Sequence, residues 1–201
     1  MTTILHIKSS SNLNGSVSRQ IGTTVLEELK QAHPTANIIE RDLVRNPIPH
    51  VSPEFIGAMF TKQDDAPVLA LSEQLIAELI ASDLIVIEVP MYNFGIPSAL
   101  KAWIDHVARA GKTFSYGANG PKGLLNGKKA ILILGRGGVY SEGPMKAMDY
   151  QEPYMRSVLG FLGITDVESI TVEGVNMGAE KAAAALAGAK QHAHTITHKA
   201  A

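Results

Sequence analysis

The sequence predicts a doubly wound α/β domain, in which a five-stranded parallel sheet is covered by helices on both faces. Two observations carry this prediction. Short runs rich in β-branched residues alternate with amphipathic helical patterns along the chain. Several of these runs are continuously apolar, as strands covered on both faces are. Because no repeat or linker interrupts the pattern, we expect residues 1–201 to form a single domain.

Five runs account for the expected strands. The weakest, 37–43, is interrupted by charged residues, whereas 130–135 and 169–175 are continuous. The runs are ILHIK at 4–8, NIIERDL at 37–43, LIVIEV at 84–89, AILILG at 130–135 and SITVEGV at 169–175.

Helical patterns separate these strands. Apolar residues recur at i, i+3 and i+4, and a helix is expected from Pro97 because proline fits the first helical turn, where its missing N–H costs nothing. The expected helices cover 16–32, 68–81, a segment from 97, about 150–162, and 179–199.

The connection 44–67 is Pro-rich and long for a compact domain. Loops of this length are usually functional or disordered. We therefore expect a mobile lid over a substrate, with Met59 and Phe60 facing the substrate pocket.

The overall composition excludes several classes of protein. The 18 Lys and Arg residues nearly balance 19 Asp and Glu, and no basic block could track a phosphate backbone, so we do not expect a nucleic-acid partner. Cysteine is absent, which excludes disulfides and cysteine nucleophiles and suits a reducing compartment. The start of the chain lacks a signal peptide and no run of about 18 apolar residues occurs. We expect a soluble, cytoplasmic protein without a membrane partner.

Common catalytic and nucleotide motifs are also missing. There is no G-x-S-x-G elbow, no obvious carboxylate pair and no His-x-x-x-His on a core helix, so no metal site is expected. GLLNGKK at 123–129 departs from a P-loop in length and lacks the Ser or Thr, and GRGGVY from 135 fails the dinucleotide pattern.

Three loops should meet where ligands bind in such sheets, beyond the carboxyl ends of the strands. The first, 9–18, places five serines between a strand and a helix. A helix N-terminus offers unpaired N–H groups and a positive dipole end, so these hydroxyls suit a phosphate monoester. The alternative is an N-cap with a polar turn.

The other two loops suit a flat heteroaromatic ring. Loop 90–97 combines Met91, Tyr92 and Phe94 with the polar Asn93, a mixture that fits a ring with polar edges. Loop 135–144, GRGGVYSEGP, begins with GRGG, whose backbone can approach a ring closely because glycine has no Cβ. The alternatives are aromatic residues that pack onto the core and a tight turn. Together the three loops indicate one mononucleotide with a large planar base.

These residues resemble a known family. KSS after the first strand, PMYNFGIP followed by LKAWID, GKTFSY, RGG and FLGITDV resemble the FMN-dependent NADH azoreductases of the flavodoxin-like quinone reductase group, over about residues 3 to 178. The resemblance implies non-covalent FMN, NADH as electron donor, strand order 2-1-3-4-5, and a homodimer with active sites at the subunit interface.

The resemblance also assigns roles to individual residues. Many relatives have Ser at 135 and a polar residue such as Gln at 17, so Gly135 and Val17 are expected to contribute backbone contacts alone. The implied cofactor residues are Ser10, Ser16, Val17 and Ser18 at the phosphate, Met91, Tyr92, Asn93 and Phe94 along the flavin, and Gly135, Arg136, Gly137 and Gly138 at its other edge. Tyr116 and Phe161 are similar to aromatic residues near the flavin face; a hairpin Tyr and a core Phe are the alternatives.

The implied activity is a two-electron ping-pong transfer. NADH delivers hydride to flavin N5, and a quinone or azo compound then takes the same place; cleaving an azo bond to two amines needs two rounds. No side chain is assigned as catalytic. Backbone N–H groups would stabilise the anionic reduced ring, with Arg136 either adding positive charge or lying solvated at the surface. The alternatives are a flavodoxin-type electron carrier, which the net charge of -1 disfavours, an FMN reductase acting on nitroaromatics, and a flavin-free interaction protein.

Overall fold

The sheet has the predicted architecture. The computed structural model describes residues 1–61, 63 and 65–199. Its central sheet contains β1 (Thr3–Lys8), β2 (Asn37–Asp42), β3 (Leu84–Pro90), β6 (Lys129–Gly135) and β7 (Asp166–Val172), in the order β2-β1-β3-β6-β7. All neighbouring pairs are parallel. Among these five strands the order is 2-1-3-4-5, so the expected fold class is confirmed.

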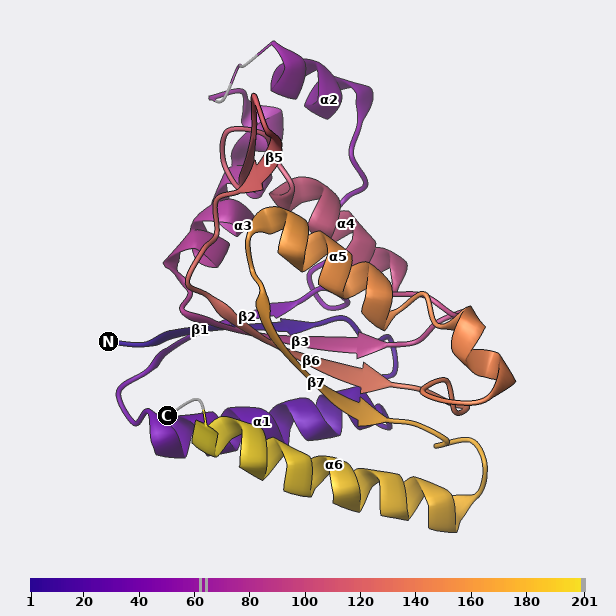
Figure 1. Cartoon of the computed structure of the whole chain (residues 1–201). Coiled ribbons are helices and arrows are strands. Elements are labelled where there is room, and N and C mark those ends of the chain that lie inside the picture. The colour runs from indigo at the N-terminus through magenta and orange to yellow at the C-terminus, as the bar shows by residue number, and fades with distance from the viewer. Residues whose placement is uncertain (62, 64, 200–201) are drawn as a thin grey trace.

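Helices cover both faces of this sheet (Figure 1). On one face lie α1 (Val17–Ala32) and α6 (Ala179–Lys199), which share a core with alternate residues of β1, β3, β6 and β7. On the other lie α3 (Ala70–Ala81), α4 (Ser98–Val107) and α5 (Glu152–Leu162), which form the larger core. Every residue of β3 is buried. A strand covered on both faces has no polar face, which explains the continuous apolar run in the sequence.

The last strand begins and ends earlier than expected. It was predicted over 169–175, but β7 spans Asp166–Val172. Gly174 has a φ of +73°, a conformation that does not continue a strand. Residues 173–176 therefore turn away from the sheet and lie beside the loop that follows β6.

The connection 44–67 is not wholly irregular. It contains α2 (Pro53–Phe60), which begins after Ser52, whose Oγ accepts a hydrogen bond from the Phe55 N–H at 3.2 Å. Phe55 and Ala58 pack with Leu69 as a small separate cluster. A short 3-10 turn, η1 (Pro67–Leu69), then leads into α3. Residues 62 and 64 of this connection lie outside the description.

A hairpin lies outside the central sheet. The strands β4 (Phe114–Gly117) and β5 (Gly120–Gly123) pair antiparallel and were not among the five expected. Each has four residues and β5 carries two glycines, so neither makes a strong apolar pattern. A second 3-10 turn, η2 (Pro144–Met148), precedes α5. Within the described residues, no helix combines the length and apolarity needed to cross a bilayer.

Candidate functional site: two adjoining cavities at the carboxyl edge of the sheet

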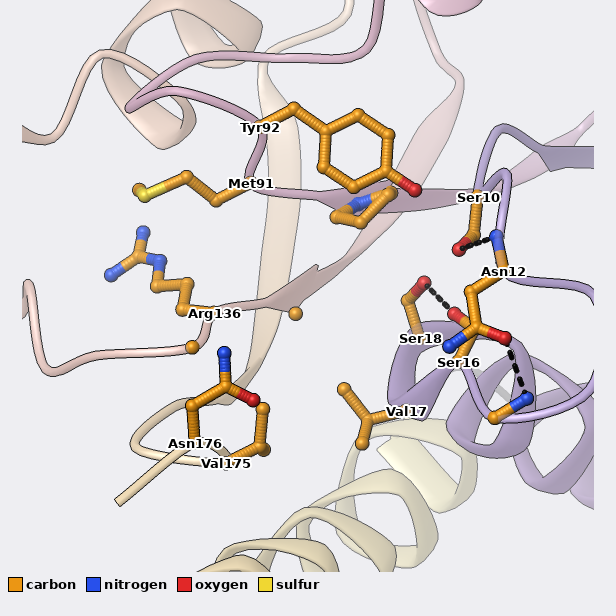
Figure 2. Close-up of a pocket in the computed structure, with 14 residues that line it drawn as sticks. Ser10, Asn12, Ser16, Val17, Ser18, Met91, Tyr92, Arg136, Val175 and Asn176 are labelled. Atoms are coloured by element: carbon orange, nitrogen blue, oxygen red, sulfur yellow. Dashed lines mark hydrogen bonds between the residues drawn. The ribbon is translucent and has the colours of Figure 1, made fainter.

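Two adjoining cavities open at the carboxyl ends of β1, β3, β6 and β7. One measures about 230 Å³ and is shown in Figure 2; the other measures about 480 Å³. They share Met91, Gly137 and Asn176 as lining residues. All twelve residues expected to bind the cofactor line one or both. Nine of the twelve line the smaller cavity, and Asn93, Phe94 and Gly138 line the larger.

The first loop ends in a cluster of buried hydroxyls at the start of α1. Ser16 is the N-cap, and its Oγ accepts a hydrogen bond from the Arg19 N–H at 3.3 Å. The same Oγ lies 3.0 Å from Ser18 Oγ, as Figure 2 shows. Within the first loop, Ser10 Oγ accepts a hydrogen bond from the Asn12 N–H at 3.3 Å, and both residues line the same cavity. Hydroxyls beside a helix N-terminus suit an anion, because they add donors to the free N–H groups of the first turn.

An ion pair between Arg19 and Asp42 holds this loop in place. Arg19 donates to both carboxylate oxygens of Asp42, at 2.8 and 3.0 Å, and also to the backbone oxygen of Ser10 from Nε and Nη2. Burial acts to raise the pKa of Asp42, but the hydrogen bonds from Arg19 and from two backbone N–H groups lower it to about 2. The charge of Arg19 is thus compensated by Asp42, and the guanidinium fixes the path of the loop.

The third-strand loop is a tight turn centred on two residues with left-handed backbone. Tyr92 and Gly95 exchange backbone hydrogen bonds of 2.9 and 3.1 Å, while Asn93 and Phe94 have φ values of +48° and +71°. This is the pattern of a type I′ turn, which favours Asn first but Gly second. A phenylalanine there costs about 1–2 kcal/mol of strain, and such strain is typical of functional sites.

Tyr92 joins this turn to the first loop. Its Oη accepts a hydrogen bond from the Ser11 N–H at 3.0 Å. Burial acts to raise the pKa of Tyr92, but hydrogen bonds from Ser10, Ser11 and the nearby backbone outweigh it and lower the pKa. The phenol therefore fixes the distance between the hydroxyl cluster and the turn that carries Phe94.

The glycines at the end of β6 and in the loop after it pack closely against neighbouring side chains. A Cβ at Gly137 would lie 2.6 Å from Asn176 Nδ2, and one at Gly135 would lie 3.2 Å from Val17 Cγ2. The loop after β7 is hydrogen-bonded alongside: the Asn176 N–H donates to the Gly137 oxygen at 3.0 Å. Val17 and Gly135, the two departures from the family pattern, therefore lie against each other, and the small Gly135 leaves room for the branched Val17.

Arg136 is buried, so the alternative that its side chain lies solvated at the surface is wrong. Its side chain is 2% exposed and surrounded by carboxylates: Nη2 lies 2.7 Å from Asp149 Oδ2 and 3.7 Å from Glu152 Oε2, and Nη1 lies 3.4 Å from Glu173 Oε2. Burial acts to raise the pKa of Glu173, but hydrogen bonds from Ser141 and the Tyr140 N–H and the charge of Arg136 lower it. The positive charge of Arg136 is therefore compensated within the protein.

Four backbone N–H groups beside the larger cavity remain available. Among the described residues, the N–H groups of Asn93, Phe94, Gly137 and Gly138 take part in no protein hydrogen bond. By contrast, the N–H groups of Met91 and Arg136 bond to the Gly135 and Val172 oxygens. Free donors at the rim of a cavity fit a planar ligand with polar edges. The residues present thus fit a phosphate at one end and a flat, hydrogen-bonding ring at the other.

The chain matches a family model over residues 2–196, described as a flavodoxin-like fold. The chain belongs to this flavodoxin-like family. It is 50% identical over 192 residues to an FMN-dependent NADH:quinone oxidoreductase of Herminiimonas arsenicoxydans, covering 93% of this chain and 94% of that one. It is 47% identical over 197 residues to a protein of the same name from Azotobacter vinelandii, covering 95% and 97%. The resemblance predicted from the motifs is confirmed.

Solved structures give the same result. The azoreductase from Bacillus anthracis strain Sterne superposes with a TM-score of 0.92 at 32% identity, covering 99% of this chain and all of that one. An FMN-dependent NADH-azoreductase from the Ames Ancestor strain, solved in complex with FMN, superposes at 0.86 with 24% identity. The second likeness supports the flavodoxin-like fold alone.

Four expected substrate-pocket residues line neither cavity of this flavodoxin-like domain. Tyr116 lies in the β4–β5 hairpin and is 73% exposed, and Phe161 is partly exposed on α5. Both contact Phe114, with ring centroids 5.5 and 4.5 Å apart. On α2, Met59 packs against the small Phe55 cluster while Phe60 is 81% exposed. A single chain therefore does not bring these four side chains to the twelve that line the cavities.

Several lining residues were not among the expected site residues, and three of them lie in the loops that follow β6 and β7. Val175 and Asn176 follow β7 and line the smaller cavity; the sequence prediction placed residue 175 inside a strand. Tyr140 lines the larger cavity and contacts Phe94, with ring centroids 6.2 Å apart. The glycine at 174 was the available signal, because glycine inside an expected strand often marks a bend.

Proposed function

We propose that this chain is an oxidoreductase that binds FMN non-covalently and uses NADH to reduce quinones. One observation carries the proposal: buried hydroxyls at the N-terminus of α1 adjoin a cavity rimmed by four free backbone N–H groups. These features would allow phosphate recognition and ring recognition side by side, as a flavin mononucleotide requires. The relatives named FMN-dependent NADH:quinone oxidoreductases support the same reading.

The proposed phosphate site uses no cationic side chain. Ser10, Ser16 and Ser18 would donate hydroxyl hydrogen bonds, and the backbone of Val17 would add the N–H of the first helical turn. Arg136 lines this cavity, but its charge is compensated by carboxylates. The dianion would therefore be stabilised by hydrogen bonds and by the helix dipole.

The larger cavity would hold the flavin ring and the reacting molecules. Met91 and Phe94 would supply apolar surface there, with Tyr92 adding to it from the adjoining smaller cavity, and the free N–H groups of residues 93, 94, 137 and 138 would stabilise negative charge on the ring edge. Bound FMN would supply hydride acceptance and two-electron release. Excess positive charge from Arg136 is not needed for this role, because preorganised N–H dipoles stabilise an anion without reorganisation.

The proposal also covers the order in which NADH and the electron acceptor bind. The larger cavity measures about 480 Å³, and the flavin itself would occupy part of it. We therefore propose that NADH and the acceptor use the remaining space in turn, in a ping-pong cycle. An azo compound would then need two rounds to be cleaved to two amines.

A homodimer would complete the substrate pocket. Phe60, Tyr116 and Phe161 present apolar surface to solvent at 81%, 73% and 38% exposure, and a subunit interface would cover this surface. We propose that these residues and Met59 lie at a subunit interface and reach the flavin site of the second copy. Size-exclusion chromatography with light scattering tests this, and a monomer at micromolar concentration contradicts it.

A cytoplasmic location and a single domain over residues 1–201 also remain predictions.

A spectroscopic titration tests the central proposal. The purified protein is loaded with FMN, desalted, reduced without oxygen by NADH, and titrated with a benzoquinone. We expect a flavin spectrum that bleaches with NADH and returns at one equivalent of quinone. Loss of FMN on desalting would contradict flavin binding, and retained FMN that NADH does not reduce would favour the electron-carrier alternative. Azo dyes and nitroaromatics are then tested as acceptors in separate assays. Cleavage of an azo dye to two amines should consume two NADH, and reduction of a nitroaromatic alone would favour the nitroaromatic alternative.

A further inference from the structure

The segment Asp149–Tyr150–Gln151 contacts both loops that form the ring side of the site. It lies between η2 and the start of α5 and was not among the expected site residues. Asp149 accepts from Arg136 Nη2 at 2.7 Å, and the Tyr150 N–H donates to the Phe94 oxygen at 3.0 Å. The Gln151 side chain contacts both Val89 and Arg136. We call these three residues the 149–151 brace.

Gln151 is the central residue of this brace. Its side-chain Nε2 donates to the Val89 oxygen at 2.6 Å, and its Oε1 accepts from Arg136 Nε at 2.8 Å. Val89 immediately precedes the loop that begins with Pro90, and Arg136 immediately follows β6. Gln151 is 0% exposed. One fully buried amide thus spans the two strand ends from which the third and fourth loops leave.

The rest of the brace is itself held rigidly. Asp149 Oδ1 accepts from the N–H groups of Gln151 and Glu152, which anchors it to the first turn of α5. Since Arg136 also contacts Glu173, which accepts from the Tyr140 and Ser141 N–H groups, the network extends around the whole fourth loop. Side chains in fully satisfied buried networks have few alternative arrangements.

We propose that Gln151 is a positioning residue: through the 149–151 brace it holds the strained 92–95 turn and the RGG loop at the separation needed for the ring of FMN. The identity of the ligand in this inference rests on the proposed function. The coupling between Gln151 and the turn is independent of that function. The strained backbone at Asn93 and Phe94 needs such support, because residues in this conformation persist only where the surroundings hold them. The free N–H groups of the two loops, which line the same cavity, would then be available to one ligand.

The test compares Gln151→Leu with Ser72→Ala. Leucine has a similar size to glutamine and removes both side-chain hydrogen bonds. Ser72 is a matched control: it is also 0% exposed, donates to a backbone oxygen, that of His106, at 2.6 Å, and accepts from an arginine, Arg109, at 3.3 Å. Unlike Gln151, it lies on α3 and lines neither cavity. Both variants should lose comparable global stability.

Two readouts separate positioning from a general loss of stability. In Gln151→Leu, we expect the dissociation constant for FMN to rise about tenfold, and the Gly95 N–H, which donates to Tyr92, to exchange with solvent at least about fivefold faster in the FMN-free protein. Ser72→Ala should change neither by more than about twofold. Equal effects in the two variants, or none in Gln151→Leu, would overturn the proposal.

The amide-exchange readout also separates this inference from the proposed function. If the parent protein does not retain FMN, the proposed function fails, but Gly95 exchange still decides whether the brace holds the turn. If Gln151→Leu does not fold, Gln151→Glu replaces it, because glutamate keeps an acceptor for Arg136 but has no N–H for Val89. Faster Gly95 exchange is expected there as well, and unchanged exchange would overturn the coupling through the Val89 oxygen.

Discussion

Gly22 on α1 lies directly against the carboxylate of Glu88 on β3: a Cβ at this glycine would stand 2.2 Å from Glu88 Oε1. The same oxygen is 2.9 Å from His6 Nε2, and both side chains are at most 1% exposed. Ser9 Oγ donates to the backbone oxygen of Glu88 at 2.5 Å. A buried polar pair between sheet and helix therefore lies next to the loop that carries the hydroxyl cluster.

Replacing Gly22 should destabilise the protein although alanine is the better helix former. We expect Gly22→Ala to lower the free energy of unfolding by about 1–3 kcal/mol, because the carboxylate or the helix must move. Gly188→Ala is the control: it changes a helical glycine on neighbouring α6 that has open space around its Cβ, so it should raise stability by about 0.5–1 kcal/mol. Urea unfolding measures both, and a stabilised Gly22→Ala would refute the close contact.

His6 and Glu88 should be strongly coupled in stability. His6→Leu leaves the buried side-chain oxygen of Glu88 without its hydrogen-bond partner and is expected to cost about 1–3 kcal/mol. The double variant His6→Leu/Glu88→Leu should cost less than the sum of the two single changes, since it leaves no unpaired polar group. A double-mutant cycle from denaturant unfolding measures the difference, and additive costs would show that the pair is energetically unimportant.

The ion pair of Arg19 and Asp42 should make the free energy of unfolding depend on pH in the acidic range. The folded pKa of Asp42 is about 2, below its ordinary value of 3.8, so the ionised carboxylate stabilises the fold above about pH 4. That contribution, about 1–2 kcal/mol after solvent screening, is lost as the pH falls towards 2. In Asp42→Asn it should be missing at every pH. The stability difference between parent and variant should therefore shrink from pH 6 to pH 2, and a constant difference would contradict the depressed pKa.

Phe94 should combine backbone strain with ring contact. Phe94→Gly and Phe94→Ala both remove the aromatic surface, but only glycine tolerates a φ of +71° without strain. We expect the glycine variant to be more stable than the alanine variant by about 1 kcal/mol, while both lose FMN affinity to a similar extent. Thermal unfolding and flavin fluorescence titration measure the two effects. A more stable alanine variant would contradict the left-handed conformation.

Ser18 should distinguish FMN from riboflavin. Ser18→Ala removes one hydroxyl from the proposed phosphate site, and a hydrogen bond to a charged group is worth about 1.5–3 kcal/mol, so FMN affinity should fall about 10- to 100-fold. Riboflavin, which lacks the phosphate, should bind the variant and the parent equally. Thr23→Ala, on an exposed side of the same helix, serves as the control variant. Equal losses for both ligands would place the phosphate elsewhere.

The sequence predicted the loops of the site better than the network that supports them. Ser10, Ser16 and Ser18 are local to one strand–loop–helix unit, and Met91 to Phe94 are consecutive, so short-range patterns were enough to predict that they lie at one site. The 149–151 brace and Asn176 are separate in sequence from the loops they contact. Their hydrogen bonds depend on how α5 and the end of β7 pack, which no local pattern records.

Arg136 shows the same limit for charge. The sequence leaves two alternatives for an arginine among glycines: its positive charge is available to the ligand, or its side chain is solvated at the surface. Three carboxylates from two other segments, at positions 149, 152 and 173, surround it in the folded chain. Whether a charge is available to a ligand depends on its neighbours in space, so this property could not be predicted from the loop.

The sequence by itself determined the fold class, because hydrophobic periodicity is a local property. The strand order and the twelve expected cofactor residues, which line the cavities, came from the family resemblance. Tertiary structure decided which of these groups are free to meet a ligand. Packing between distant segments buries Arg136, and among the described residues it leaves four backbone N–H groups unpaired at the cavity. It also leaves Phe60 and Tyr116 exposed to solvent, because no other described segment covers them.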